Sequence, residues 1–148
     1  MTPYEKVFKV FFHKIKDPFF VDFDEQFATE ELIYLLNESI STFEYPKIDL
    51  RDKDDELQQF NNTLTFDEIS ILAEGMALFW AEGMLRDIDS LAYDMTPEEM
   101  RTTSKANHIN SLIRFEDKLR DNLKARKQNY NKRDGNRPLF NTLGGDGE

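Results

Sequence analysis

The feature that most constrains the fold is a long apolar stripe in the middle of the chain. Apolar residues recur at three- and four-residue spacing from Ile69 to Leu91, over about six helical turns. The residues directly before the stripe, Thr65-Phe66-Asp67-Glu68, have the pattern of a helix capping box. We therefore expect residues 66–91 to form the central helix, whose core side chains include Leu72, Met76, Phe79 and Trp80.

A short repeat interrupts this stripe with glycine. The tetrapeptide AEGM occurs twice, eight residues apart, and places Gly75 and Gly83 inside the expected helix. A glycine in a helix interior costs about 1 kcal/mol relative to alanine. The repeat therefore predicts close approach of a neighbouring helix at these positions.

Further helices are expected on both sides of the central one. Thr2-Pro3-Tyr4-Glu5 reads as a capping box with proline at the first helical position, and Asp17-Pro18 should end that Phe-rich helix. A second helix should begin in 22–26 or at Thr29 and end at Tyr45-Pro46. The polar segment 47–56 is expected to be an exposed loop, in which 48–50 could form a short strand.

The C-terminal half carries a fourth and a fifth helical signal. Thr96-Pro97-Glu98-Glu99 is another capping box, which predicts a short helix. Ser104 should cap a last long helix that ends near Tyr130 and places Ile109 and Leu112 in the core. The chain is thus expected to be all-α, a small bundle of about four to five helices with an extended C-terminal tail.

The same patterns divide the chain into a body and a tail. Its 148 residues suffice for one hydrophobic core. Residues 1–130 are the expected helical body. Residues 131–148 are the expected extended docking tail, because four of the six glycines and one proline lie among few apolar residues.

Charge is distributed unevenly along the chain. Residues 1–100 carry 8 Lys and Arg against 23 Asp and Glu, whereas residues 101–137 carry 11 against 4, a net charge of +7. An acidic body is unsuited to wrapping nucleic acid, since phosphate binding needs a positive surface. The basic stretch could contact phosphates, but the favoured interpretation is a solvated helix end that prefers cations.

The residues that usually mark catalysis or metal binding are sparse. The chain has no cysteine and two histidines, His13 and His108, neither of which has Glu three residues before it. No Gly-rich phosphate loop or nucleophile motif occurs, and no stretch resembles a signal peptide or a membrane span. We therefore expect no enzymatic activity, no cofactor, no metal and no membrane contact.

Two sets of residues are candidates for partner binding. The tail contains apolar residues with no evident core to join, and an alternative is a disordered end with accidental apolar residues. The tail candidates are Arg137, Pro138, Leu139, Phe140 and Leu143. The candidates at the basic helix end are Lys124, Arg126, Lys127, Lys132 and Arg133.

The order of these features resembles the small neck proteins of tailed bacteriophages, the head-to-tail connector or adaptor class. The resemblance rests on Thr65–Trp80, on the segment Thr103-Ser104-Lys105-Ala106-Asn107-His108-Ile109, on the basic helix end and on Arg137-Pro138, and it spans about residues 30–140. Its motifs are a helix pattern and a short polar turn.

The resemblance implies a non-enzymatic virion protein, assembled in the host cytoplasm. It implies a homo-oligomeric ring, commonly of twelve copies, whose partners are the portal protein and other neck or tail proteins. DNA would only pass through the lumen, which an acidic body suits because like charges repel. The alternative is a soluble helical regulatory or chaperone-like protein that binds a partner through its C-terminal tail.

Overall fold

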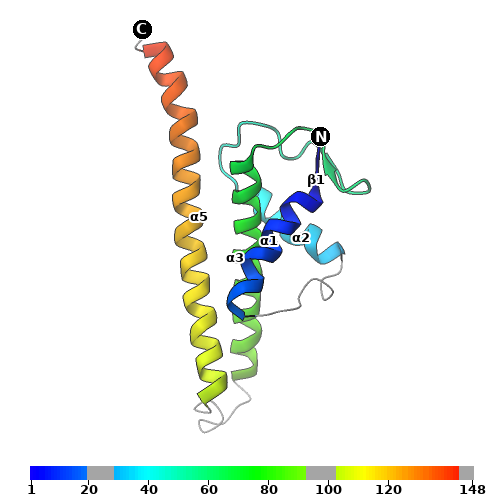
Figure 1. The fold of residues 1–148 in the computed structure, drawn as a ribbon, viewed down its shortest axis with the longest axis vertical. Helices are drawn as coiled ribbons and strands as arrows, with labels where there is room; N and C mark the ends of the chain where they lie inside the picture. Colours follow the sequence, from blue (N-terminus) through cyan, green and yellow to red (C-terminus); the bar gives the residue numbers. More distant parts are fainter. Residues whose placement is uncertain (20–28, 93–102, 144–148) are drawn as a thin grey trace.

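The computed structural model describes residues 1–19, 29–92 and 103–143, with side chains described for 1–15, 29–87, 107 and 109–133. The predicted all-α class is confirmed, since the described chain consists mainly of four helices (Figure 1). They are α1 (Tyr4–Phe19), α2 (Thr29–Ser41), α3 (Phe66–Ala92) and α5 (Thr103–Leu143). The helix predicted at 96–99 lies outside the described residues.

The helix α3 is central, as its apolar stripe predicts. Helices α1, α2 and α5 all pack against it, and α5 runs antiparallel along one side (Figure 1). Leu72, Met76 and Leu112 are fully or almost fully buried, and Trp80 is 8 % exposed. Phe79 and Ile109 are only partly buried, because each lies at the edge of the stripe rather than at its centre.

The start of α3 confirms the predicted capping box. The amide of Thr65 donates to Glu68 Oε1 over 2.7 Å, and the amide of Glu68 donates to Thr65 Oγ1 over 3.3 Å. These reciprocal bonds satisfy backbone groups that the first helical turn leaves without partners. Glu68 is 1 % exposed, so the cap is part of the core.

The capping box predicted at the start of α1 is wrong. Thr2–Pro3 forms the strand β1, which pairs antiparallel with β3 (Gln59–Phe60). The Thr2 hydroxyl donates to the carbonyl of Asn62 and accepts from the amide of Leu64, so it is unavailable to cap α1. A distant segment thus supplies the hydrogen bonds that the local motif was expected to supply.

The expected loop 47–56 contains part of a small sheet. The strand β2 (Lys53–Asp54) pairs antiparallel with β3, which gives the order β1-β3-β2. The short strand considered at 48–50 is absent from the described structure, and Leu50 is buried rather than exposed. Most of the loop's charged residues do reach solvent.

Close helix approach is confirmed at Gly75 and wrong at Gly83. A Cβ on Gly75 would collide with Ser39 Oγ of α2 and would lie 3.1 Å from Ser39 Cβ. The same hydroxyl donates to the Leu72 carbonyl over 2.8 Å, which locks α2 onto α3. Among the residues whose side chains are described, a Cβ on Gly83 would meet only Arg86 of its own helix, at 3.8 Å.

Three helix boundaries differ from the predicted ones. The helix α1 includes Pro18 and ends at Phe19, α2 ends at Ser41, before Tyr45-Pro46, and α5 begins at Thr103 rather than after Ser104. The larger correction is at the other end of α5, which continues through Leu143 instead of ending near Tyr130. The helix continues through Gly135 and Pro138, although both residue types disfavour a helix interior.

Candidate partner-docking site

The acidic side of α3 receives the basic residues of α5. Arg126 Nε lies 3.0 Å from Glu74 Oε1, and Lys14 of α1 lies 2.9 Å from Glu74 Oε2. The Glu74 side chain is 3 % exposed, so two cations from two helices compensate one buried carboxylate on a third. This arrangement joins α1, α3 and α5 through one residue.

Each copy of the AEGM repeat supplies one glutamate that pairs with an arginine of α5. Glu82 stands before Gly83 as Glu74 stands before Gly75, and Glu82 Oε2 lies 3.3 Å from Arg120 of α5. The guanidinium of Arg120 also pairs with Glu116 and, over 3.5 Å, with Asp117. Burial raises the pKa of Glu116, and the charges of Glu82 and Asp117 add to the rise while Arg120 opposes it.

A third link joins α5 to the capped start of α3. The Tyr130 hydroxyl donates to Glu68 Oε2 over 2.7 Å and accepts from the amide of Lys47 over 2.9 Å. Tyr130 is 3 % exposed, and its ring packs edge-on against Phe43. Near the same end, Arg133 lies 2.5 Å from Asp67.

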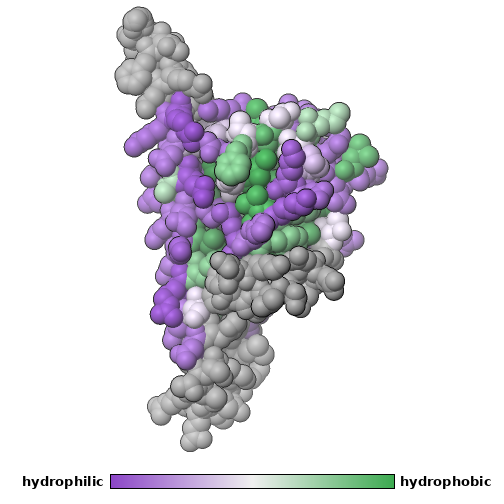
Figure 2. Space-filling model, viewed as in Figure 1, coloured by the Kyte–Doolittle hydropathy of each residue, from purple (hydrophilic) through white to green (hydrophobic). Residues whose placement is uncertain are grey.

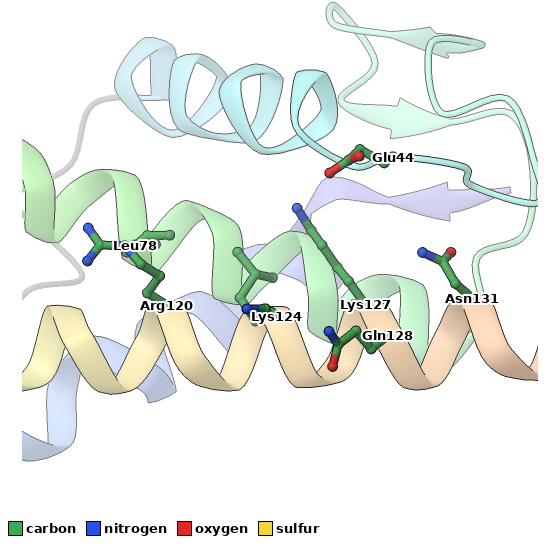
Figure 3. A pocket seen from close by; sticks show the side chains of 8 residues that line it. Glu44, Leu78, Arg120, Lys124, Lys127, Gln128 and Asn131 are labelled. Atoms are coloured by element: carbon green, nitrogen blue, oxygen red, sulfur yellow. The ribbon is translucent and has the colours of Figure 1, made fainter.

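A groove runs between α5 and the segment that follows α2 (Figure 3). It has a volume of about 360 Å³, and the eight residues that line it are Glu44, Leu78, Arg120, Leu123, Lys124, Lys127, Gln128 and Asn131. The ammonium of Lys127 donates to the carbonyl of Thr42 over 2.7 Å. Burial lowers the pKa of Lys127, and the nearby Glu44 partly opposes this effect.

The five basic candidates therefore fall into two groups. Arg126, Lys127 and Arg133 make the intramolecular contacts just described. Lys124 is exposed at the groove, and Lys132 is exposed on α5. The interpretation of this stretch as a helix end does not hold, because the helix continues to Leu143 and its cations lie opposite acidic residues of α3.

The expected tail residues lie on the last turns of α5. Side chains beyond Arg133 are outside the described set, so Arg137, Pro138, Leu139, Phe140 and Leu143 are placed only by their helical backbone. Arg133 is next to Asp67 at the start of α3, and residues 134–143 continue for about 15 Å past it at 1.5 Å per residue (Figure 1). We call residues 134–143 the α5 arm.

Sequence reasoning missed an exposed aromatic ring at the base of the arm. Phe66, the first residue of α3, is 76 % exposed. The capping box identified its position as the start of a helix, where the side chain of the first residue can face away from the core. Because Asp67 pairs with Arg133, Phe66 stands close to the point where the α5 arm begins.

Three further observations concern the described residues. Figure 2 shows that the visible side of α5 is mostly hydrophilic over its described part. His13 is exposed on α1, and the described residues contain no cluster of three His, Asp or Glu that could hold a metal ion. Among the described helices, none is long and apolar enough to cross a membrane.

The described residues thus present three candidate docking features, namely the helical backbone of the arm, an exposed ring and a charged groove. Comparisons of the chain with protein-family models, with curated proteins and with solved structures find no match.

Proposed function

We propose that this chain is a structural adaptor that docks to other proteins through α5 and carries out no chemistry. In its specific form the proposal is a head-to-tail connector subunit of a tailed phage, which forms a ring below the portal. The observation that carries the docking role is the α5 arm, which continues past the start of α3 (Figure 1).

The composition of the arm supports a docking role. It contains Leu139, Phe140 and Leu143 beyond the helices that form the core. Burial of one such side chain contributes about 1.5–3 kcal/mol. A segment that is already helical loses less conformational entropy on binding than a disordered one, so these few side chains suffice for a useful affinity.

The charge distribution supports a ring through which DNA passes. Residues 1–100 carry a net charge of −15, and several cations of α5 are paired with acidic residues of α3. Paired cations attract phosphate less than free ones do, and an acidic surface repels it. These features favour sliding of DNA over binding of DNA.

The arm is tested by removing it. A chain truncated after Arg133 should keep the helicity of its other helices and its melting temperature, because the backbone of the arm continues past the start of α3 (Figure 1). It should no longer join portal rings or particles, as measured by native mass spectrometry and negative-stain imaging. Normal assembly of the truncated chain would overturn the proposal, and a 1:1 complex with a single partner would favour the regulatory alternative.

A point variant tests the base of the arm with a matched control. Phe66→Ala should weaken docking without lowering stability, since the ring is 76 % exposed in the free protein. Tyr34→Ala removes a ring that is 62 % exposed on α2 and should leave docking unchanged. Equal loss of docking in both variants would contradict a role specific to this end of the molecule.

A further inference from the structure

We infer that the groove beside α5 receives the β2–β3 turn of a second copy of this chain. The cationic groove is the cavity lined by Arg120, Lys124 and Lys127 described above, and the hairpin knob is residues 54–58. The inference rests on the proposed function only in requiring that copies of the chain associate.

The hairpin knob is acidic with one apolar residue at its tip. Asp54, Asp55 and Glu56 precede Leu57, and Asp55 is paired with Lys53 over 2.7 Å. Leu57 is 67 % exposed, and among the described residues few other large apolar side chains are as exposed. Scattered exposed leucines are ordinary on protein surfaces. Leu57, however, lies on a turn directly after three carboxylates. An apolar side chain next to negative charges is complementary to a groove that combines buried leucines with cations.

The knob is held rigid before any partner arrives. Asp54 Oδ1 accepts from the amides of Glu56 and Leu57, over 2.9 and 3.0 Å. Tyr4 of α1 braces the turn twice, through its amide to the carbonyl of Gln58 over 2.8 Å and through its hydroxyl to Asp55 Oδ1 over 2.6 Å. A preorganised loop loses little conformational entropy on docking.

The groove offers the complementary surface. Leu78 and Leu123 are buried and form its apolar floor, while Lys124 is exposed and Lys127 is half-buried (Figure 3). The groove is lined by Arg120, Lys124, Lys127 and one carboxylate, Glu44. Because Arg120 is paired with Glu82, Glu116 and Asp117, the cations that would meet an acidic partner are Lys124 and Lys127. A volume of about 360 Å³ lies near the lower limit of pockets that hold small ligands, so it suits a turn tip.

Charge complementarity selects a second copy as the occupant. Residues 1–100 carry a net charge of −15, so acidic segments of like chains are repelled by most of that part, whereas Lys124 and Lys127 at the groove attract the carboxylates of the knob. The knob projects away from α5 in Figures 1 and 3, whereas the groove lies along α5. A chain therefore cannot fill its own groove, and the contact joins two copies. A ring, as proposed above, requires the head-to-tail form of this contact rather than a reciprocal pair.

A head-to-tail contact of this kind has a structural consequence. The knob of each copy occupies the groove of the next, so every copy keeps one knob and one groove for its two neighbours. Such heterologous contacts generate a closed ring when the rotation between copies closes, and a filament otherwise. The same contact would set the spacing of subunits in the proposed ring.

Cysteine cross-linking tests the contact, because the chain has no cysteine of its own. Full chains carrying Leu57→Cys are mixed with mass-tagged full chains carrying Gln128→Cys, a residue that is exposed at the groove. Oxidation should give the mixed disulfide at a yield at least about tenfold above that with Tyr34→Cys, an exposed site on α2, and tenfold corresponds to 1.4 kcal/mol of association free energy.

A charge swap tests whether the groove's cations cause the docking. Adding Lys124→Glu to the Gln128→Cys chain should reduce the mixed disulfide, and adding Glu56→Lys to the Leu57→Cys chain should restore it. Far-ultraviolet circular dichroism of each chain checks that it is folded.

Two outcomes overturn the inference. Equal yields for Gln128→Cys and Tyr34→Cys would show that the knob does not enter the groove. Preferential formation of the Gln128→Cys homodimer would assign the groove to a two-fold contact instead. Either result leaves the arm-dependent docking of the proposed function standing, because that role is measured by truncation after Arg133.

Discussion

At the scale of single residues, the AEGM repeat shows how identical local sequence acquires different roles. Its first copy places Gly75 against α2 and Glu74 in the buried centre of three helices. Its second copy places Gly83 in contact with no other helix among the described side chains, and Glu82 at a half-exposed ion pair. A substitution in one copy of the repeat therefore has a matched control in the same substitution in the other copy.

Alanine should have opposite effects at the two glycines. Gly75→Ala should destabilise the protein by about 1–3 kcal/mol, because its Cβ forces Ser39 Oγ off the Leu72 carbonyl and overpacks the contact. Gly83→Ala should stabilise by up to about 1 kcal/mol through helix propensity alone. Chemical denaturation measures both free energies of unfolding, and a shared sign would contradict the assigned packing.

The two glutamates of the repeat should differ in the same way. Glu74→Gln removes the charge from a buried carboxylate that holds Lys14 and Arg126, and should cost about 1–3 kcal/mol. Glu82→Gln weakens a more exposed pair and should cost at most about 1 kcal/mol. Thermal melts of the two variants give the comparison, and equal losses would count against Glu74 as the link between three helices.

At the scale of elements, α5 is attached to α3 through side chains spaced along its length. Leu112, Leu119 and Leu123 bury their side chains, and Arg120, Arg126 and Arg133 pair with acidic residues of α3. Tyr130 adds the segment after α2 to this contact. The apolar residues supply most of the burial energy, and the ion pairs select one antiparallel register.

Removal of one hydroxyl should loosen this attachment. Tyr130→Phe keeps the ring against Phe43 but deletes the hydrogen bonds to Glu68 and from the Lys47 amide. Because Glu68 is 1 % exposed, the unsatisfied carboxylate should cost about 1–3 kcal/mol. Tyr45→Phe, at a ring that is 75 % exposed, should change unfolding by less than about 0.5 kcal/mol, measured in urea.

At the scale of the whole molecule, an acidic body is closed on one side by a basic helix. This layout places α1 and α2 on one part of α3 and α5 along another, with the arm and the hairpin knob projecting from the body (Figure 1). Self-repulsion among residues 1–100, whose net charge is −15, opposes compaction. The cations of α5 relieve part of that repulsion, so the global stability depends on which carboxylates are ionised.

Glu116 should make the global stability depend on pH. Its pKa is raised in the folded protein, mainly by burial, so folding favours its protonated form. That contribution is fully present below the unfolded-state pKa and is lost as pH rises through the raised folded-state pKa. The stability of wild type relative to Glu116→Gln should therefore fall as pH increases from about 4 upward.

Denaturation of both proteins at several pH values measures this difference. Charged groups that face Glu116 are Glu82, Asp117 and Arg120, and all three remain in the variant. The comparison therefore isolates one carboxyl group. If the stability of wild type relative to Glu116→Gln instead rose with pH, the burial of Glu116 against α3 would be contradicted.

The sequence alone was sufficient to predict those features that depend on residues close together in the chain. The stripe and the Thr65 capping box identified α3 because apolar spacing and a reciprocal hydrogen bond both act within a few helical turns. The close approach at Gly75 was also readable from the cost of a glycine in a helix. For α2, Thr29 was one of two starts that the pattern left open.

Long-range partners decided the rest. Thr2 looked like a cap, but its pairing with Phe60 and its bonds to Asn62 and Leu64 come from residues about sixty positions away. The basic stretch looked like a helix end, yet Arg126 and Arg133 face carboxylates of α3 that are distant in sequence. Each of these contacts depends on which segments meet in the folded chain, and residue periodicity contains no information about that.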